Sequence, residues 1–145
     1  MPTSPPIRYE ELAPTLPEGQ VDLGQTVPGE GPLELDVGFG RGRSILARAA
    51  AHPELRVLGL ELKAKWAHKV AERLAREGLD NARAYRADAR EVLARAGPDA
   101  CLRRVCVHFP DPWWKKRHRK RRVVSERFLD TLARLLEPGG ELFVQ

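Results

Sequence analysis

Leu33-Glu34-Leu35-Asp36-Val37-Gly38-Phe39-Gly40-Arg41-Gly42 is the stretch from which the fold class of this 145-residue chain follows. Five residues of strand character lead into three glycines at alternate positions, and an alanine- and leucine-rich helix is predicted directly afterwards, at residues 44–51. Glycines let the backbone approach a ligand closely, and the start of a helix presents free N–H groups. The stretch therefore predicts a strand, a ligand-binding loop and a helix.

The remainder of the chain repeats this alternation. Further strands are predicted at residues 56–61, 82–87, 104–109 and 141–145, and further helices at residues 63–77, 89–96 and 122–136. In the helix at 63–77, Trp66, Val70 and Leu74 share one apolar face. The alternation predicts a Rossmann-like α/β fold with a doubly wound, mostly parallel sheet. Because the last predicted strand closes the sequence, we expect the sheet to lack its last strands in this chain.

The first 30 residues differ from the rest in composition. They hold half of the chain's 12 prolines, which exclude a long helix or a central strand. We expect an irregular arm over residues 1–30, with one short turn at residues 9–12, and a folded domain over residues 31–145.

Positive charge is concentrated in one short segment. The chain has a net charge of +5 and a pI near 9.6, and seven of its 25 Lys and Arg residues lie within residues 115–122. The remainder is slightly acidic, so the segment favours a polyanionic partner. Cys101 and Cys106 are expected on opposite faces as buried thiols, which favours neither a disulfide nor a metal site. No membrane span or signal peptide is recognised, so we expect a cytoplasmic protein.

Three acidic residues come at the carboxyl ends of consecutive predicted strands: Asp36, Glu61 and Asp88. Ligands of open α/β sheets bind at that edge. Glu61 is placed to accept both hydroxyls of a ribose, whereas Asp88 could contact an adenine amine, cap the following helix, or do both. Together these acids indicate a cofactor that contains adenosine.

The glycine spacing bears on which cofactor this is. A dinucleotide site usually has Gly-x-Gly-x-x-Gly without an acid ahead of it, because a carboxylate there would face the pyrophosphate. Here the spacing is Gly-x-Gly-x-Gly, and Asp36 precedes it. A carboxylate suits a cofactor that carries positive charge, which favours S-adenosylmethionine over NAD.

A second stretch, Val107 to Arg122, combines features suited to chemistry on a nucleobase. Asp111 stands between Pro110 and Pro112 on a stiff turn. Two tryptophans and the seven cations follow; a base stacked on an indole gains about 1–3 kcal/mol, and the cations suit phosphates. We expect RNA binding here, and we expect His108 to be a packed, satisfied side chain.

Three segments closely resemble the tRNA (guanine-N7)-methyltransferase family: residues 35–42, Phe109-Pro110-Asp111-Pro112-Trp113, and residues 117–122. The resemblance implies a class I fold, S-adenosylmethionine as cofactor, tRNA as partner, and methylation of guanosine 46 in the variable loop. It implies cofactor contacts by the acids Asp36, Glu61, Asp88 and Asp111 beside the loop glycines Gly38, Gly40 and Gly42. It further implies that Asp111 is catalytic, and it implies substrate contacts by Lys115, Arg117, His118, Arg119, Lys120, Arg121 and Arg122.

The chain also departs from this family's pattern. Asp36 stands where the family usually has glutamate, Trp114 adds a second indole at a variable position, and the family's later Thr-Asp-Trp stretch is absent. Other functions stay open at this point: an exocyclic-amine methyltransferase, since Asp111-Pro112-Trp113-Trp114 loosely resembles Asp-Pro-Pro-Tyr, or a catalytically idle RNA-binding module. An NAD enzyme is a more distant alternative. The sequence is compatible with a monomer or a homodimer.

Overall fold

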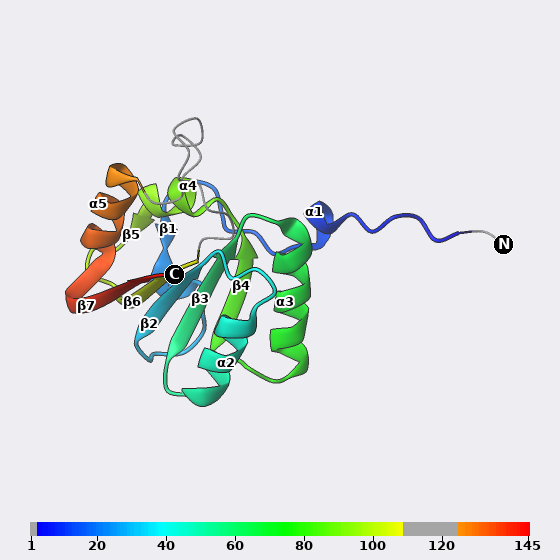
Figure 1. The fold of residues 1–145 in the computed structure, drawn as a ribbon, viewed down its shortest axis with the longest axis horizontal. Coiled ribbons are helices and arrows are strands. Elements are labelled where there is room, and N and C mark those ends of the chain that lie inside the picture. Colours follow the sequence, from blue (N-terminus) through cyan, green and yellow to red (C-terminus); the bar gives the residue numbers. More distant parts are fainter. Residues whose placement is uncertain (1–2, 109–124) are drawn as a thin grey trace.

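The computed structural model describes residues 3–108 and 125–145, and its centre is a parallel sheet of five strands (Figure 1). The strand order is β4-β3-β2-β6-β7. The strands are β2 (Leu33–Val37), β3 (Arg56–Glu61), β4 (Ala82–Arg86), β6 (Leu102–Val107) and β7 (Leu136–Val144). All neighbouring pairs are parallel, which confirms the predicted sheet.

Helices cover both faces of the sheet (Figure 1). They are α2 (Arg43–Ala51) and α3 (Ala64–Arg76) on one face, and α4 (Ala89–Ala94) and α5 (Glu126–Leu135) on the other. Successive strand residues point to opposite faces, so the leucines of β2 enter the α4–α5 core while its acids point toward α2. Within the described residues no helix has the length and apolar character needed to cross a bilayer.

The chain reverses its direction of winding at β2. From β2 it proceeds through β3 to β4 on one side, and later through β6 to β7 on the other. The gap between the carboxyl ends of β2 and β6 is therefore the topological switch point, where doubly wound sheets bind their ligands. The glycine loop follows β2 at this point, and His108 follows β6.

The arm expected over residues 1–30 is attached to the domain from Tyr9 onward. The short helix α1 (Tyr9–Leu12) packs against α3, as the ring contact between Tyr9 and His68 shows. Farther on, β1 (Val21–Asp22) pairs with β5 (Ala96–Gly97), and the η1 turn (Leu23–Gln25) follows. Val21, Leu23 and Val27 are buried in the main core, so their apolar side chains hold a segment that its prolines suggested was irregular.

The other differences from the sequence prediction are local. The last strand was predicted over residues 141–145, but β7 already begins at Leu136. Pro138-Gly139-Gly140 forms an irregularity within β7, because Leu102 pairs with Leu136 whereas Arg104 pairs with Glu141. Cys101 and Cys106 are half-buried rather than buried.

Trp66 was predicted to share an apolar face of α3 with Val70 and Leu74, but its burial differs from theirs. Val70 and Leu74 are buried, but Trp66 is only half-buried. Ala64 and Ala67 occupy the buried positions of this end of α3. Their small side chains let the helix lie close to the sheet, which leaves no room for an indole between them.

Candidate active site

The loop after β2 depends on backbone conformations that favour glycine. Gly38, Gly40 and Gly42 have φ angles of 73°, 56° and 85°. Gly42 begins α2, and a Cβ atom there would lie 2.6 Å from Cγ2 of Val70. A Cβ atom at Gly40 would meet no atom within 4 Å among the described residues. An alanine side chain at position 42 would therefore clash with Val70 of α3, whereas one at position 40 would contact none of the described residues.

Replacing Gly42 with alanine should lower the free energy of unfolding by about 2–4 kcal/mol. A left-handed residue with a Cβ costs about 1–2 kcal/mol, and the clash with Val70 adds an overpacking cost. Urea denaturation measures the change. Gly40→Ala is the matched control, because it carries the same type of strain without the clash; equal losses in both variants would contradict the close approach of α2 and α3.

Glu61 ties the loops after β2 and β3 together. Its side chain is buried. Its Oε1 accepts a hydrogen bond from the backbone N–H of Gly40 at 2.9 Å, and its Oε2 accepts a hydrogen bond from the backbone N–H of Lys63 at 2.7 Å. Each carboxylate oxygen can accept a second donor. Glu61 can therefore shape the glycine loop and still bind two hydroxyl groups of a ligand.

Asp36 is the second buried acid at this edge. Its Oδ2 accepts a hydrogen bond from the hydroxyl of Ser44 at 2.7 Å, and its Oδ1 lies 3.0 Å from Nε2 of His108. The second contact is short but not aligned as a full hydrogen bond, so Oδ1 has no such partner within the described residues. Buried acceptors without a partner are rare and occur at functional sites.

His108 lies on the opposite side of the switch point from the glycine loop. Its backbone N–H donates to the carbonyl of Val37 at 2.9 Å, and its Nε2 lies 3.3 Å from the hydroxyl of Ser44. The carboxylate of Asp36 raises the pKa of His108 above its ordinary value of 6.5, against the opposing effect of burial. Sequence reasoning expected a satisfied histidine but missed its contact with Asp36.

Ser44, His108 and Asp36 are the residue types of a hydrolytic triad, but their geometry differs from one. In such a triad the acid and the hydroxyl contact different ring nitrogens. Here Ser44 and Asp36 both lie near Nε2 of His108, and the hydroxyl of Ser44 donates its hydrogen bond to Asp36. The cluster therefore orients Asp36 rather than activating a nucleophile.

His108→Gln should change the pH dependence of stability. Because the folded-state pKa is raised, the imidazolium stabilises the fold fully below pH 6.5, and this contribution is lost as the pH rises through the folded-state pKa. The difference in free energy of unfolding between the two proteins should therefore shrink with rising pH. Urea denaturation over a pH series measures it, and a difference that does not vary with pH would contradict the interaction with Asp36.

Asp88 performs the capping role that the sequence suggested. Its carboxylate accepts a hydrogen bond from the backbone N–H of Arg90 at 3.0 Å at the start of α4. The side chain of Asp88 is 39% exposed. It therefore stays accessible to a ligand, and capping does not exclude the expected contact with an adenine.

Glu34 is a buried acid that sequence reasoning missed. It is 4% exposed and lies beneath Asp36 on the same face of β2. Arg48 of α2 donates to its two carboxylate oxygens at 2.8 and 2.9 Å, and this interaction raises the pKa of Arg48. The ion pair holds α2 against the sheet below the glycine loop. The alternation of Glu34 with Asp36, both facing α2, was the signal that could have revealed it.

The other predicted site residues lie outside the described residues. They are the expected catalytic Asp111 and the expected tRNA contacts Lys115, Arg117, His118, Arg119, Lys120, Arg121 and Arg122. Asp36, Gly38, Gly40, Gly42 and Glu61 are brought together at the switch point by the contacts above. Asp88 follows the neighbouring strand β4 at the same edge of the sheet.

Comparisons with known proteins bear on this arrangement. A family model described as "Putative methyltransferase" matches residues 30–145. A tRNA (guanine-N(7)-)-methyltransferase of Rhodospirillum rubrum is 47% identical over 112 residues, which cover 77% of this chain and 44% of the relative. The tRNA (guanine-N(7)-)-methyltransferase of Nitrosococcus oceani is 40% identical over 147 aligned positions, which cover 93% of this chain and 60% of the relative. The chain thus spans about half the length of the curated relatives it matches.

Solved structures support the same fold. The antibiotic-resistance methyltransferase Kmr has a TM-score of 0.59 and 27% identity, covering 84% of this chain and 62% of its own. A Haemonchus contortus phosphoethanolamine N-methyltransferase solved with S-adenosyl-L-methionine has a TM-score of 0.60 and 23% identity. The match covers 84% of this chain and 26% of that enzyme. The chain therefore has the Rossmann-like methyltransferase fold. It belongs to the methyltransferase family whose model matches residues 30–145, in agreement with the resemblance of its sequence to tRNA (guanine-N7)-methyltransferases.

Proposed function

We propose that this chain binds S-adenosylmethionine at the carboxyl edge of β2, β3 and β4. The observation that carries the proposal is the set of three acids at the ends of adjacent strands, with Glu61 hydrogen-bonded to the glycine loop at Gly40. S-Adenosylmethionine has a cationic amino group, two ribose hydroxyls and an adenine amine. Each of these groups is a hydrogen-bond donor, and the carboxylates of the three acids can accept hydrogen bonds from all of them.

The individual assignments follow from the environment of each acid. Asp36 is assigned to the amino group, because its Oδ1 has no full hydrogen bond within the described residues. Glu61 is assigned to the ribose hydroxyls, and the partly exposed Asp88 to the adenine amine. Gly38 and Gly40 bring the backbone beside the ligand without side chains in the way. When bound, the cofactor supplies an electrophilic methyl group.

We further propose that the methyl acceptor is N7 of a guanosine in tRNA, guanosine 46 by family resemblance, in the cytoplasm. The names of the two relatives, both tRNA (guanine-N(7)-)-methyltransferases, and the sequence of residues 109–122 support this proposal. Guanine N7 carries a lone pair and no proton, so it can form the new bond to carbon without a general base. The role of the protein is then alignment, and Asp111 is proposed to stabilise the positive charge that develops on the base.

The decisive experiment is transfer of labelled methyl from S-adenosylmethionine to an unmodified tRNA transcript, followed by analysis of the labelled base. We expect the label in 7-methylguanine, and we expect none when the variable-loop guanosine is replaced by adenosine. Label in an exocyclic-amine product would instead identify an amine methyltransferase. Binding of tRNA without transfer of label would identify an idle RNA-binding module.

A further inference from the structure

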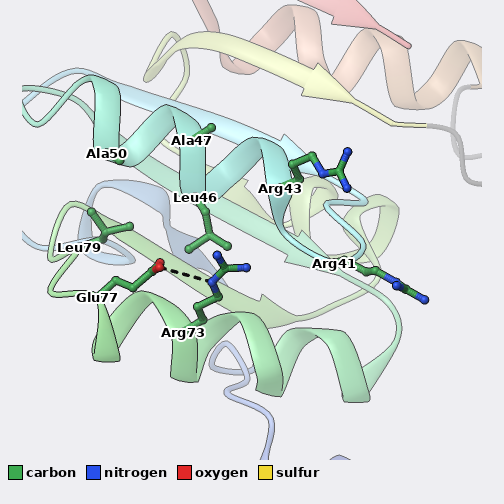
Figure 2. Close-up of a pocket in the computed structure, with 8 residues that line it drawn as sticks. All are labelled: Arg41, Arg43, Leu46, Ala47, Ala50, Arg73, Glu77 and Leu79. Carbon is green, nitrogen blue, oxygen red and sulfur yellow. Dashed lines mark ion pairs between the residues drawn. The ribbon is translucent and has the colours of Figure 1, made fainter.

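A basic surface extends over the outer side of α2 and α3, away from the sheet (Figure 2). Two adjoining cavities of about 740 and 450 Å³ share Arg41 and Arg73 in their linings. We call it the Trp66 surface; its aromatic and basic residues are Arg41, Arg43, Lys65, Trp66, Lys69, Arg73 and Arg76. Two acids also line the cavities, and each has a partner: Glu72 lies 2.7 Å from His68, and Glu77 pairs with Arg73. Figure 2 shows Arg73 between the two helices, with Arg41 and Arg43 at the end of the groove nearest the glycine loop.

Most cations of the Trp66 surface have no acidic partner. Arg73 forms a 3.5 Å salt bridge with Glu77, whereas the other five cations form none within the described part of the chain. Elsewhere, Arg48, Arg95 and Arg134 reach a carboxylate at 2.9 Å or less. Other described arginines, such as Arg83 and Arg104, form no salt bridge but lie on different parts of the molecule. The Trp66 surface is distinct because it brings five cations without a salt bridge together, although the chain outside residues 115–122 is slightly acidic overall.

The cations surround an aromatic ring. Arg41, Lys65 and Lys69 lie 5.0, 5.1 and 5.9 Å from the centroid of the Trp66 ring. Each cation gains from the ring, but three like charges around it repel one another. A bound polyanion would neutralise that repulsion, and the half-buried indole would offer part of a face to a base.

The surface is continuous with the candidate active site. Arg41 lies between Gly40 and Gly42 in the loop at the switch point, and its guanidinium contacts Trp66 at the start of α3. From there Lys65, Lys69 and Arg73 follow at intervals of one helical turn, about 6 Å each. A row of single positive charges that leads away from the active edge suits the backbone of a nucleic acid strand.

We propose that the Trp66 surface binds the phosphate backbone of the RNA substrate, outside the basic segment 115–122. The identity of that RNA as tRNA rests on the proposed function. An acidic protein is less well matched, because its carboxylates are irregularly spaced, whereas phosphates recur at every nucleotide along a strand.

The test compares two double variants that lose the same charge. Lys65→Gln/Lys69→Gln removes two cations beside Trp66, whereas Arg103→Gln/Arg127→Gln removes two exposed cations on β6 and α5. Binding of a fluorescein-labelled tRNA transcript is followed by anisotropy from about 50 to about 200 mM salt, without cofactor. Circular dichroism melting checks that both variants are folded.

We expect the Lys65/Lys69 variant to lose about tenfold or more in affinity and to show a log–log salt slope smaller in magnitude by about 1.5–2. The control variant should stay within about threefold of the unaltered chain. Equal losses in the two variants would overturn the proposal, as would an unaltered chain that does not bind tRNA, or equal competition by polyglutamate and by unlabelled RNA. Because no methyl transfer is measured, failure of the proposed function would show separately, as RNA binding without 7-methylguanine.

Discussion

Glu61→Ala is expected to lower the affinity of the chain for S-adenosylmethionine by about 100-fold or more. Two hydrogen bonds from ribose hydroxyls to a carboxylate are lost, each worth about 1.5–3 kcal/mol. The substitution also removes the acceptor of the backbone N–H groups of Gly40 and Lys63, so the loop beside the ligand loses its anchor. Titration calorimetry with the cofactor measures the loss.

Two controls separate binding from structure in this prediction. Glu61→Gln keeps the shape of the side chain and one acceptor oxygen, but its amide nitrogen faces one of the two backbone donors, so an intermediate affinity is expected. Glu54→Ala removes an acid that is 65% exposed and should leave the affinity unchanged. An affinity of Glu61→Ala within threefold of the unaltered chain would contradict the assignment of Glu61 to the ribose.

Asp111→Ala is expected to reduce the rate of methyl transfer by about 100-fold or more while changing tRNA affinity far less. A fixed group that stabilises charge developing in a transition state contributes about 10²–10³ to the rate. Between Pro110 and Pro112 the carboxylate is held on a stiff turn, so it can be positioned before the base arrives. Single-turnover transfer of labelled methyl, with saturating cofactor and tRNA, measures the chemical step.

Asp111→Asn is the companion variant, because it keeps size and hydrogen bonding but removes the charge. If charge stabilisation is the role of Asp111, both variants should be slow. If Asp111→Asn retained the full rate, the residue would act through hydrogen bonding alone. Unchanged turnover in Asp111→Ala would refute its catalytic role.

The parallel sheet could be predicted because each strand and helix carries its own signal. β2 and β3 are short segments rich in leucine and valine, β4 alternates alanine with arginine or tyrosine, and glycine or proline marks several ends of the helices between them. The pairing of β1 with β5 could not be predicted, because each strand has two residues and the pair brings distant segments together. The partial burial of Trp66 could not be predicted for a related reason: helical periodicity assigns a face but does not report how closely Ala64 and Ala67 bring α3 to the sheet.

Some residues of the candidate site could likewise be predicted from the sequence, and others could not. Asp36, Glu61 and Asp88 could be located because the end of a strand is visible in the sequence and parallel strands end at a common edge. The contact of His108 with Asp36 depends on β6 lying beside β2, which reverses the sequence order of the strands. The Trp66 surface was missed because its cations are dispersed in the sequence and gather only when α3 packs beside the glycine loop.

The central claim is that the edge formed by Asp36, Glu61 and Asp88 binds S-adenosylmethionine, and calorimetric titration of the folded chain with this cofactor tests it most directly. We expect one site per chain, the same site occupied by S-adenosylhomocysteine, and no heat of binding with NAD. A chain that is folded by circular dichroism but binds no S-adenosylmethionine, or that binds NAD instead, would contradict the assignment of this edge.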